Sequence, residues 1–525
     1  MKDMNKTAVF ILAAGFVLSA AGAPAVDFKV KGEWDFYFNF GETTMYKKPY
    51  AARKMDESID AFQPVSRIRL QMEAAVSENL SGVLQLEIGN HVWGRAGTRD
   101  APSGASMGER GASVKVKRAH MDWQAPDAGL RCAVGLQGIA LPNAAGGSAV
   151  LDEDTAAVAA SWKVNDHASL AALWARPYND NYVRGDWGGR GSDAAFDNLD
   201  LGMLAVPLTF DGFSAVPWAM FGMMGKNAVR HQFATGGIPY AGDYIQRGLF
   251  PADAGQRFTE NDTHRSAGAR FTRPYAAMFW AGIPIRISAF DPFNIEFDVN
   301  YGYVGGFGRY NDARAVNPDG SPRRNDSRRE GFVLKALVEH KTDWGIPGVF
   351  GWYGSGDSGN TRNGSGRMPC PAPAGDFSSF GLAGYYGDFD SLMIGERVDA
   401  GYSGTWAVGA QIKDLSFLEG LSHDVRIIYR RGANDPAMAK ALRDTLGYGY
   451  DNTAWNRQPG GALYLTRNDY LVEFNLDSAC KISENLEARV ELGYIVNGVD
   501  RSTWKWSGNQ KEDAWKVAIT MRYSF

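Results

Sequence analysis

The fold is decided by the C-terminal stretch Trp515-Lys516-Val517-Ala518-Ile519-Thr520-Met521-Arg522-Tyr523-Ser524-Phe525. Apolar side chains occupy every odd position, and polar side chains occupy most even positions. Successive side chains of a β-strand point to opposite faces of a sheet. The stretch therefore predicts a strand with one apolar face and one polar face.

The same alternation recurs along the chain, for example in residues 28–40, 68–76 and 295–303. Each run is about ten residues long, which is the length that a tilted strand needs to cross hydrocarbon. Strands of soluble sandwiches average about five to six residues. Because every backbone group in lipid must be paired, only a closed barrel accommodates long strands with an apolar outside. We expect an all-β protein, a transmembrane antiparallel β-barrel.

The composition agrees with this prediction once the two-residue period of the strands is taken into account. The chain has 525 residues, of which 45% are hydrophobic, 22% are charged and 62 are glycine, and its mean hydropathy is −0.30. The average is polar because only half of each strand's side chains would face lipid. A net charge of −4 gives no reason to expect a nucleic-acid partner. Cys132, Cys370 and Cys480 are too few and too widely spaced for a disulfide framework or a zinc site.

The N-terminus has the pattern of an export signal. Lys2 and Lys6 precede an apolar run over residues 8–18, and small residues lead to Ala25. The run is too short for a transmembrane helix of about 20 residues. We expect a signal peptide over residues 1–25, cleaved after Ala25, and a single barrel domain over residues 26–525.

Segmentation of the mature chain gives eighteen candidate strands. They are residues 27–40, 64–76, 82–90, 113–124, 129–137, 155–163, 167–176, 197–207, 215–225, 278–290, 293–304, 330–341, 346–354, 403–413, 422–431, 468–480, 486–496 and 512–525. Short connections alternate with long ones, as in an even barrel with short periplasmic turns and long extracellular loops. Segments 167–176, 278–290 and 346–354 alternate poorly, so sixteen strands remains an alternative.

Two local features are predicted within this framework. The phase of the segment 113–124 changes, which suggests a β-bulge near Lys117. Asp435 and Pro436, followed by residues 437–446 and Gly447, have the pattern of a helix with an N-cap, a first-turn proline and a C-terminal glycine.

Charged residues on the polar phase would line the interior. Arg67 and Arg69 would face inward, and Arg131 would join them. On the segment 113–124, the inward residues would be Lys115 and Lys117 if the phase before the bulge holds, or Arg118 if the phase after it holds. The connection after the segment 129–137 carries Asp152, Glu153 and Asp154, and we expect it to fold into the lumen. Carboxylates set against a basic wall in a narrowed, water-filled lumen would bias ion passage. The alternative is that these are ordinary solvated strand faces and an ordinary surface loop.

The export signal, the alternating strands and the terminal pair Tyr523 and Phe525 resemble those of a Gram-negative outer membrane porin. The terminal alternation resembles the signal that the barrel-assembly machinery reads. Three motifs resemble more specifically the homotrimeric porins of sulfate-reducing bacteria: residues 26–35 (VDFKVKGEWD), 117–123 (KRAHMDW) and 134–137 (VGLQ). This resemblance implies a homotrimer whose protomers are passive diffusion pores, each with a constriction loop after the fifth strand.

Other chemistries find less support in the sequence. Gly354–Gly359 fits G-x-G-x-x-G, but the residues that follow do not have a helical pattern, so nucleotide binding is not expected. No nucleophile elbow or H-E-x-x-H spacing occurs, and no catalytic residue is predicted. Asp357, Asp388 and Asp390 are oxygen donors among glycines and weak candidates for calcium; no other cofactor is expected.

The sequence thus predicts a porin in the bacterial outer membrane that passes small hydrophilic solutes and ions. A substrate-selective channel, for an anion such as sulfate or for a sugar, is the first alternative. An outer membrane barrel enzyme and a surface adhesin are the others.

Overall fold

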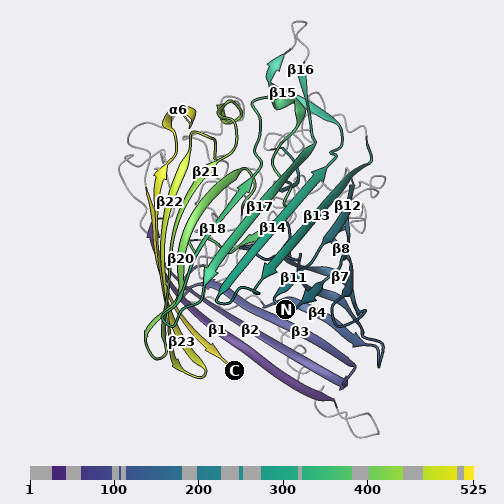
Figure 1. Cartoon of the computed structure of the whole chain (residues 1–525), viewed down its shortest axis with the longest axis vertical. Helices are drawn as coiled ribbons and strands as arrows, with labels where there is room; N and C mark the ends of the chain where they lie inside the picture. The colour runs from purple at the N-terminus through teal and green to yellow at the C-terminus, as the bar shows by residue number, and fades with distance from the viewer. Residues whose placement is uncertain are drawn as a thin grey trace.

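The structure, a computed structural model, describes residues 26–42, 61–96, 106–107, 114–179, 198–225, 248–251, 273–316, 322–380, 401–440, 465–504 and 513–525. The predicted signal peptide, residues 1–25, lies outside them. Most of the described residues belong to one antiparallel sheet that closes on itself (Figure 1).

The sheet is a closed ring of strands in chain order. These are β1 (Asp27–Glu42), β2 (Ala61–Ser77), β3 (Leu80–Val92), β4 (Val114–Gln124), β5 (Leu130–Ala140), β7 (Asp152–Lys163), β8 (Ser169–Asn179), β9 (Asn198–Ala205), β12 (Trp218–Gly225), β13 (Tyr275–Ile287), β14 (Phe293–Val304), β17 (Arg329–His340), β18 (Ile346–Gly354), β20 (Thr405–Leu418), β21 (Leu421–Gly432), β22 (Tyr470–Ser483), β23 (Leu486–Gly498) and β24 (Ala514–Ser524). Each strand pairs with the next, and β24 pairs with β1. In the described part of the chain the ring therefore has eighteen strands, as predicted, and not sixteen.

Two short strands extend this ring. β10 (Leu208–Phe210) continues β9, and β11 (Phe213–Ala215) leads into β12. Pro207 and Pro217 separate the paired pieces. Because proline has no N–H to donate to a ladder, a break at these points is expected.

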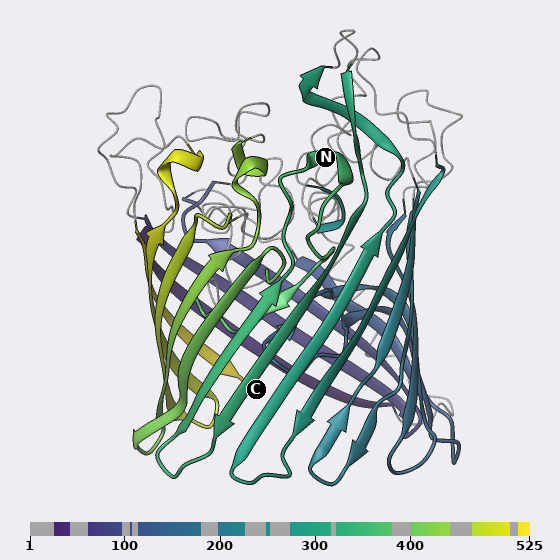
Figure 2. The ribbon, with the colours of Figure 1, turned by 45° about the horizontal axis from the view of Figure 1, so that its top comes forward.

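Short turns lie at one end of the barrel and the longer connections at the other (Figure 2). The hairpin of β15 (Arg309–Val316) and β16 (Pro322–Asp326) extends beyond the end with the long connections (Figure 1). At the same end, a helical turn begins at Pro436, where the Asp435 side chain accepts a hydrogen bond from Ala437 N at 2.8 Å. This confirms the predicted start of that helix, whereas its predicted end lies outside the described residues.

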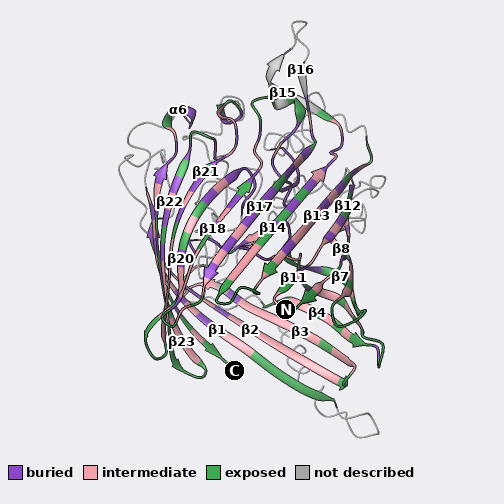
Figure 3. Ribbon diagram, in the orientation of Figure 1, coloured by how far each residue is buried: buried purple, intermediate pink, exposed green. Residues whose placement is uncertain are grey.

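The two faces of the wall differ as the period of two requires (Figure 3). In β24, Lys516, Ala518 and Thr520 are buried on the inside, whereas Ile519 and Met521 are exposed on the outside. Outward apolar side chains are exposed on many other strands, among them Trp34, Phe221 and Val349, at 42%, 62% and 59%. The outer face is therefore apolar, and the polar phase points into the lumen.

Candidate functional site

The residues predicted for the pore constriction fall into several groups, and the first is a set of paired charges on β1, β2 and β3. Arg67 Nη2 lies 2.7 Å from Asp35, and Arg69 lies 2.9 Å from Glu87 and 3.3 Å from Glu33. Both arginines point inward, as expected. Each has a carboxylate partner on a neighbouring strand, so this wall carries both signs of charge and is not purely basic.

A β-bulge on β4 lies at the predicted position. The ladder pairs Gln85 with Arg118 and Leu86 with Val116, which leaves Lys117 as the extra residue. Gln85 and Glu87 lie on the luminal face of β3. Because Arg118 pairs with Gln85, its side chain leaves β4 on the luminal face as well. Lys117 and Arg118 are consecutive, yet both reach the carboxylate of Asp154, with Arg118 Nε at 2.9 Å. A bulge makes this possible because two neighbouring residues oppose one on the partner strand.

The carboxylates expected in the constriction loop belong instead to a strand: Asp152, Glu153 and Asp154 are the first three residues of β7. The reason is that the β5–β7 ladder continues up to Ala140 and Asp152. The β4–β5 ladder, in contrast, ends at Ala119 and Leu136.

Beyond that point the end of the β5–β7 hairpin lies against Arg118 of β4. A Cβ atom on Gly138 would come within 2.5 Å of Arg118 Nη2, so the guanidinium packs directly on the backbone of this glycine and would have to shift for a larger residue. Asp154, directly opposite Gly138 in the ladder, is paired with Lys117 and Arg118 and not with Arg67 or Arg69.

The connection between β5 and β7 is buried, as a loop folded into the lumen would be. Leu141, Ala145 and Val150 are at most 1% exposed. The short strand β6 (Gly147–Ser148) pairs with β19 (Ala374–Gly375), part of the connection after β18. Lys335, a luminal residue of β17, donates to Gly147 O and lies 3.0 Å from Asp298.

A second luminal segment, residues 365–380, was not predicted. Trp280 Nε1 on β13 donates to Pro369 O at 2.9 Å, and Arg329 Nη2 on β17 donates to Met368 O at 2.8 Å. On the opposite part of the ring, Ser378 Oγ donates to Glu473 at 2.6 Å and Lys516 donates to Ser379 O at 2.6 Å. The segment thus spans the lumen from β13 to β24 and is held at both sides.

These two segments contribute to an apolar core that lies against one part of the barrel wall. Its members come from strands between β5 and β21, from the two segments and from other connections, and include Leu173, Met278, Trp280, Phe350 and Trp352. The Phe377 ring of the second segment stacks on Phe350 with centroids 4.4 Å apart. This explains the poor alternation of segments 167–176, 278–290 and 346–354, because their luminal side chains are apolar as well.

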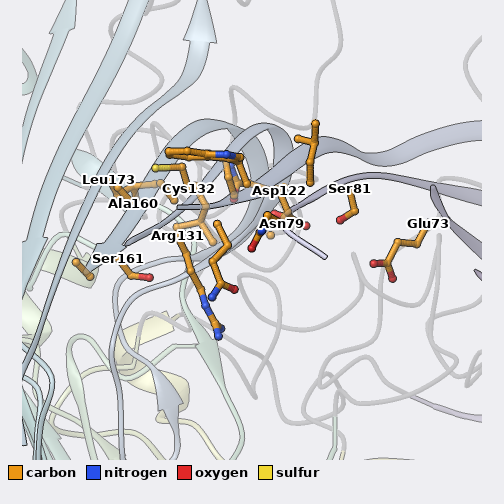
Figure 4. A pocket seen from close by; sticks show the side chains of 18 of the residues that line it. Glu73, Asn79, Ser81, Asp122, Arg131, Cys132, Ala160, Ser161 and Leu173 are labelled. Carbon is orange, nitrogen blue, oxygen red and sulfur yellow. The ribbon is translucent and has the colours of Figure 1, made fainter. Parts of the chain in front are cut away.

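Arg131 lies apart from the other predicted cations. It is the second residue of β5, beside the short turns, whereas Lys115 lies near the opposite end of β4. Arg131 lines a cavity of about 680 Å³ at the short-turn end, together with Asp122, Glu73 and Ser161 (Figure 4). The structure therefore does not bring the predicted cations together as one wall.

The C-terminal aromatic pair lies on the outer face, next to the junction where the last strand, β24, pairs with the first, β1. The rings of Tyr523 and Phe525 have centroids 5.8 Å apart, and both are close to half exposed. Phe525 N donates to Gly32 O at 3.0 Å, and Gly32 N donates to Phe525 O at 2.9 Å. The last residue is thus held by the first strand.

Of the three calcium candidates, the structure describes Asp357. Asp357 is 3% exposed and accepts hydrogen bonds from Ser365 Oγ at 2.5 Å and Gly366 N at 3.0 Å. Asp388 and Asp390 lie outside the described residues. Within the described ranges, no three His, Cys, Asp or Glu residues gather in a group that could hold a metal ion. Nor does any helix there have the length and apolarity to cross a membrane.

No family model and no curated protein sequence matches this chain. Three similar solved structures are OpdQ and OprD of Pseudomonas aeruginosa and the outer membrane channel DcaP of Acinetobacter baumannii. OpdQ is 11% identical, with 95% of this chain and 98% of that chain covered and a TM-score of 0.47. OprD is 9% identical, with 97% and 98% covered and a TM-score of 0.47. DcaP is 10% identical, with 96% and 99% covered and a TM-score of 0.38.

Proposed function

We propose that this chain is an outer membrane porin, a passive diffusion channel for small hydrophilic solutes and ions. One observation carries the proposal: a closed ring of eighteen strands has an exposed apolar outside and charged side chains on its inside. Exposed apolar surface over a whole barrel is unfavourable in water and favourable in hydrocarbon. A charged lumen inside such a wall gives ions and polar solutes a route across the membrane.

The route would follow the charged side of the lumen. The apolar core lies against strands between β5 and β21, whereas β1, β2, β3 and β24 present the charged side chains of Glu33, Arg69, Glu87 and Arg522. These side chains are between 13% and 38% exposed. Because these side chains carry both signs of charge, they would keep the route hydrated. They would select among solutes by the positions of the solute's charges more than by its net charge.

The cellular setting follows from the sequence features. We propose export by a cleaved signal peptide over residues 1–25, recognition of Tyr523 and Phe525 by the barrel-assembly machinery, and residence in the outer membrane of a Gram-negative bacterium. We also propose a homotrimer and membership in the porin family of sulfate-reducing bacteria; both rest on the motifs at residues 26–35, 117–123 and 134–137. The proposal makes the chain a channel and not a barrel enzyme or an adhesin.

The test is single-channel recording of the purified mature chain in planar bilayers. We expect stable conductance steps whose size rises linearly with salt concentration. In a salt gradient, the reversal potential of Arg69→Gln should differ from that of the wild type. Arg501→Gln, an exposed charge outside the barrel wall, is the control and should leave the reversal potential unchanged. A bilayer that stays closed to ions would overturn the proposal, and a linear solute flux would separate a diffusion pore from a substrate-selective channel.

A further inference from the structure

The cavity at the short-turn end of the lumen contains a cation that the fold does not use. Among the described residues, Arg131 makes no hydrogen bond, ion pair or ring contact, whereas Arg67, Arg69, Lys117 and Arg118 all have carboxylate partners. A guanidinium with its whole fork of donors free is suited to a planar, two-oxygen anion such as a carboxylate.

The neighbours of Arg131 extend this donor set. In the ladders, Arg131 lies directly opposite Gln124 of β4 and Ser161 of β7. Paired residues share a face of the sheet, so an amide and a hydroxyl flank the guanidinium on the luminal side. All three line the same cavity.

A carboxylate of this chain lies at the diagonal position. Asp122 is two residues before Gln124 on β4, and the residue directly opposite Asp122 is Ala133, which contributes only a methyl group. Asp122 and Arg131 do not form an ion pair. The Asp122 side chain is 47% exposed, and its one ion-pair contact with a described residue is with His120 Nε2 at 3.4 Å. Figure 4 shows Asp122 and Arg131 lining one cavity, with Glu73 farther along it.

We propose that this cavity is a binding site for small zwitterions that carry a carboxylate and an ammonium group a few ångströms apart, the class of the free α-amino acids. The inference rests on the proposed channel function and adds a site to it. The backbone positions of diagonal neighbours on one face of a sheet are about 7–8 Å apart. The long, flexible side chain of Arg131 can reach toward Asp122 from such a position, so a carboxylate on Arg131 and an ammonium on Asp122, each at about 2.8 Å, can belong to one molecule whose two groups are joined through one carbon.

The remaining charges around the cavity suit a ligand with no net charge. Lys29 lies directly opposite Glu73 across β1 and β2, and Glu78 lies on the turn after β2. The cavity thus carries two cations and three carboxylates, so a simple anion meets repulsion as well as attraction. A volume of about 680 Å³ leaves room for a side chain on the zwitterion.

The test measures how strongly glycine blocks the single-channel current of the wild-type chain and of the variants Arg131→Gln and Asp122→Asn. In wild type we expect saturable block by glycine and weaker block by 6-aminohexanoate, whose charges are far apart. Each variant should raise the half-blocking concentration of glycine about tenfold, the loss of one charge-assisted contact. Lys163→Gln removes an exposed charge at the same end of the barrel and should leave the block unchanged.

Two results would overturn the site. One is equal block of wild type and both variants by glycine, and the other is block of equal strength by acetate alone or methylammonium alone. In either case the wild-type channel still conducts, so the proposed porin function stands. If wild type shows no conductance at all, the function itself fails, and this outcome is distinct from the absence of block.

Discussion

Asp35 on the first strand and Arg522 on the last lie directly opposite one another in the ladder that closes the barrel, and Arg522 Nε donates to the Asp35 carboxylate at 2.6 Å. Asp35 also accepts hydrogen bonds from Arg67 Nη2 at 2.7 Å and Tyr37 Oη at 2.7 Å. Its side chain is fully buried, and that of Arg67 is 5% exposed. One carboxylate therefore joins three strands, β24, β1 and β2, at the seam.

Replacement of this carboxylate should weaken the closed barrel. Asp35→Asn keeps the shape but removes the carboxylate that lies 2.7 Å from the buried Arg67 guanidinium, and breaking a buried ion pair in this way costs about 3–5 kcal/mol. We expect unfolding at a lower urea concentration when the variant is folded into lipid vesicles. The folded fraction is measured from the faster migration of the folded barrel on gels of unheated samples. Asp27→Asn, which removes an exposed contact of 3.8 Å to Lys29, is the control and should change stability by no more than about 1 kcal/mol. Equal midpoints for wild type and Asp35→Asn would show that the seam does not depend on this group.

Tyr402 should hold the two luminal segments together. Its hydroxyl donates to Gly146 O in the first segment and accepts from Asp376 N in the second at 3.3 Å, and its side chain is 2% exposed. Tyr402→Phe keeps the ring contacts with Trp352 and Phe377 but removes both hydrogen bonds of the hydroxyl, at about 0.5–1.5 kcal/mol each. The bond from Asp376 N to Gly146 O at 3.2 Å remains.

The expected result of Tyr402→Phe is a noisier open-channel current, because the segments separate more often. Tyr470→Phe, on the exposed outer face, serves as the matched control. An unchanged noise spectrum in Tyr402→Phe would mean that the apolar core and the backbone hydrogen bonds between β6 and β19 hold the segments without this hydroxyl.

The ring of strands could be predicted from the sequence because its strongest signal is local. In β24 and β1, every second residue meets lipid, so the period of two survives without knowledge of any neighbour. The bulge at Lys117 was equally visible, since one extra residue shifts the phase of everything after it.

The contents of the lumen depend on contacts between distant residues, and the sequence does not reveal these. Trp280 looks like a break in the alternation of β13 until Pro369 is placed against it, 89 residues away along the chain. The poor alternation itself was the available signal, because an apolar residue on the luminal phase needs an apolar partner inside the barrel. The pairing of Asp154 with Lys117 and Arg118 was hidden for a similar reason, since it depends on where the β4–β5 ladder ends.

Asp500 should make the end of β23 sensitive to acid. Burial alone would raise the pKa of its carboxyl, but hydrogen bonds from Thr503 and Ser502 outweigh that effect and hold the pKa below the ordinary value of 3.8. Because the folded pKa is the lower one, the stabilisation is present above pH 3.8 and is lost as the pH falls through the folded value. The Thr503 amide, which donates to Asp500 at 2.7 Å, should lose protection from hydrogen exchange in that range.

The matched variant for this prediction is Asp500→Asn. Its amide oxygen still accepts a hydrogen bond but does not titrate, so protection of Thr503 should be lower at neutral pH and should not fall further in acid after correction for intrinsic exchange. Identical acid dependence in both chains would assign the effect to another group.

Asp154 should set the balance of ion preference near the bulge, because Lys117 and Arg118 both pair with its carboxylate. Asp154→Asn leaves two cations of β4 uncompensated, and a surplus of positive charge in a lumen draws anions. We therefore expect the reversal potential in a KCl gradient to move toward the chloride equilibrium potential. Asp166→Asn, which removes a fully accessible carboxylate from a short turn, should not move it. The double variant Asp154→Asn, Lys117→Gln removes one charge of each sign and should return the reversal potential most of the way to the wild-type value. If the double variant matched Asp154→Asn alone, the shift would come from displacement of the β5–β7 hairpin and not from the lost charge.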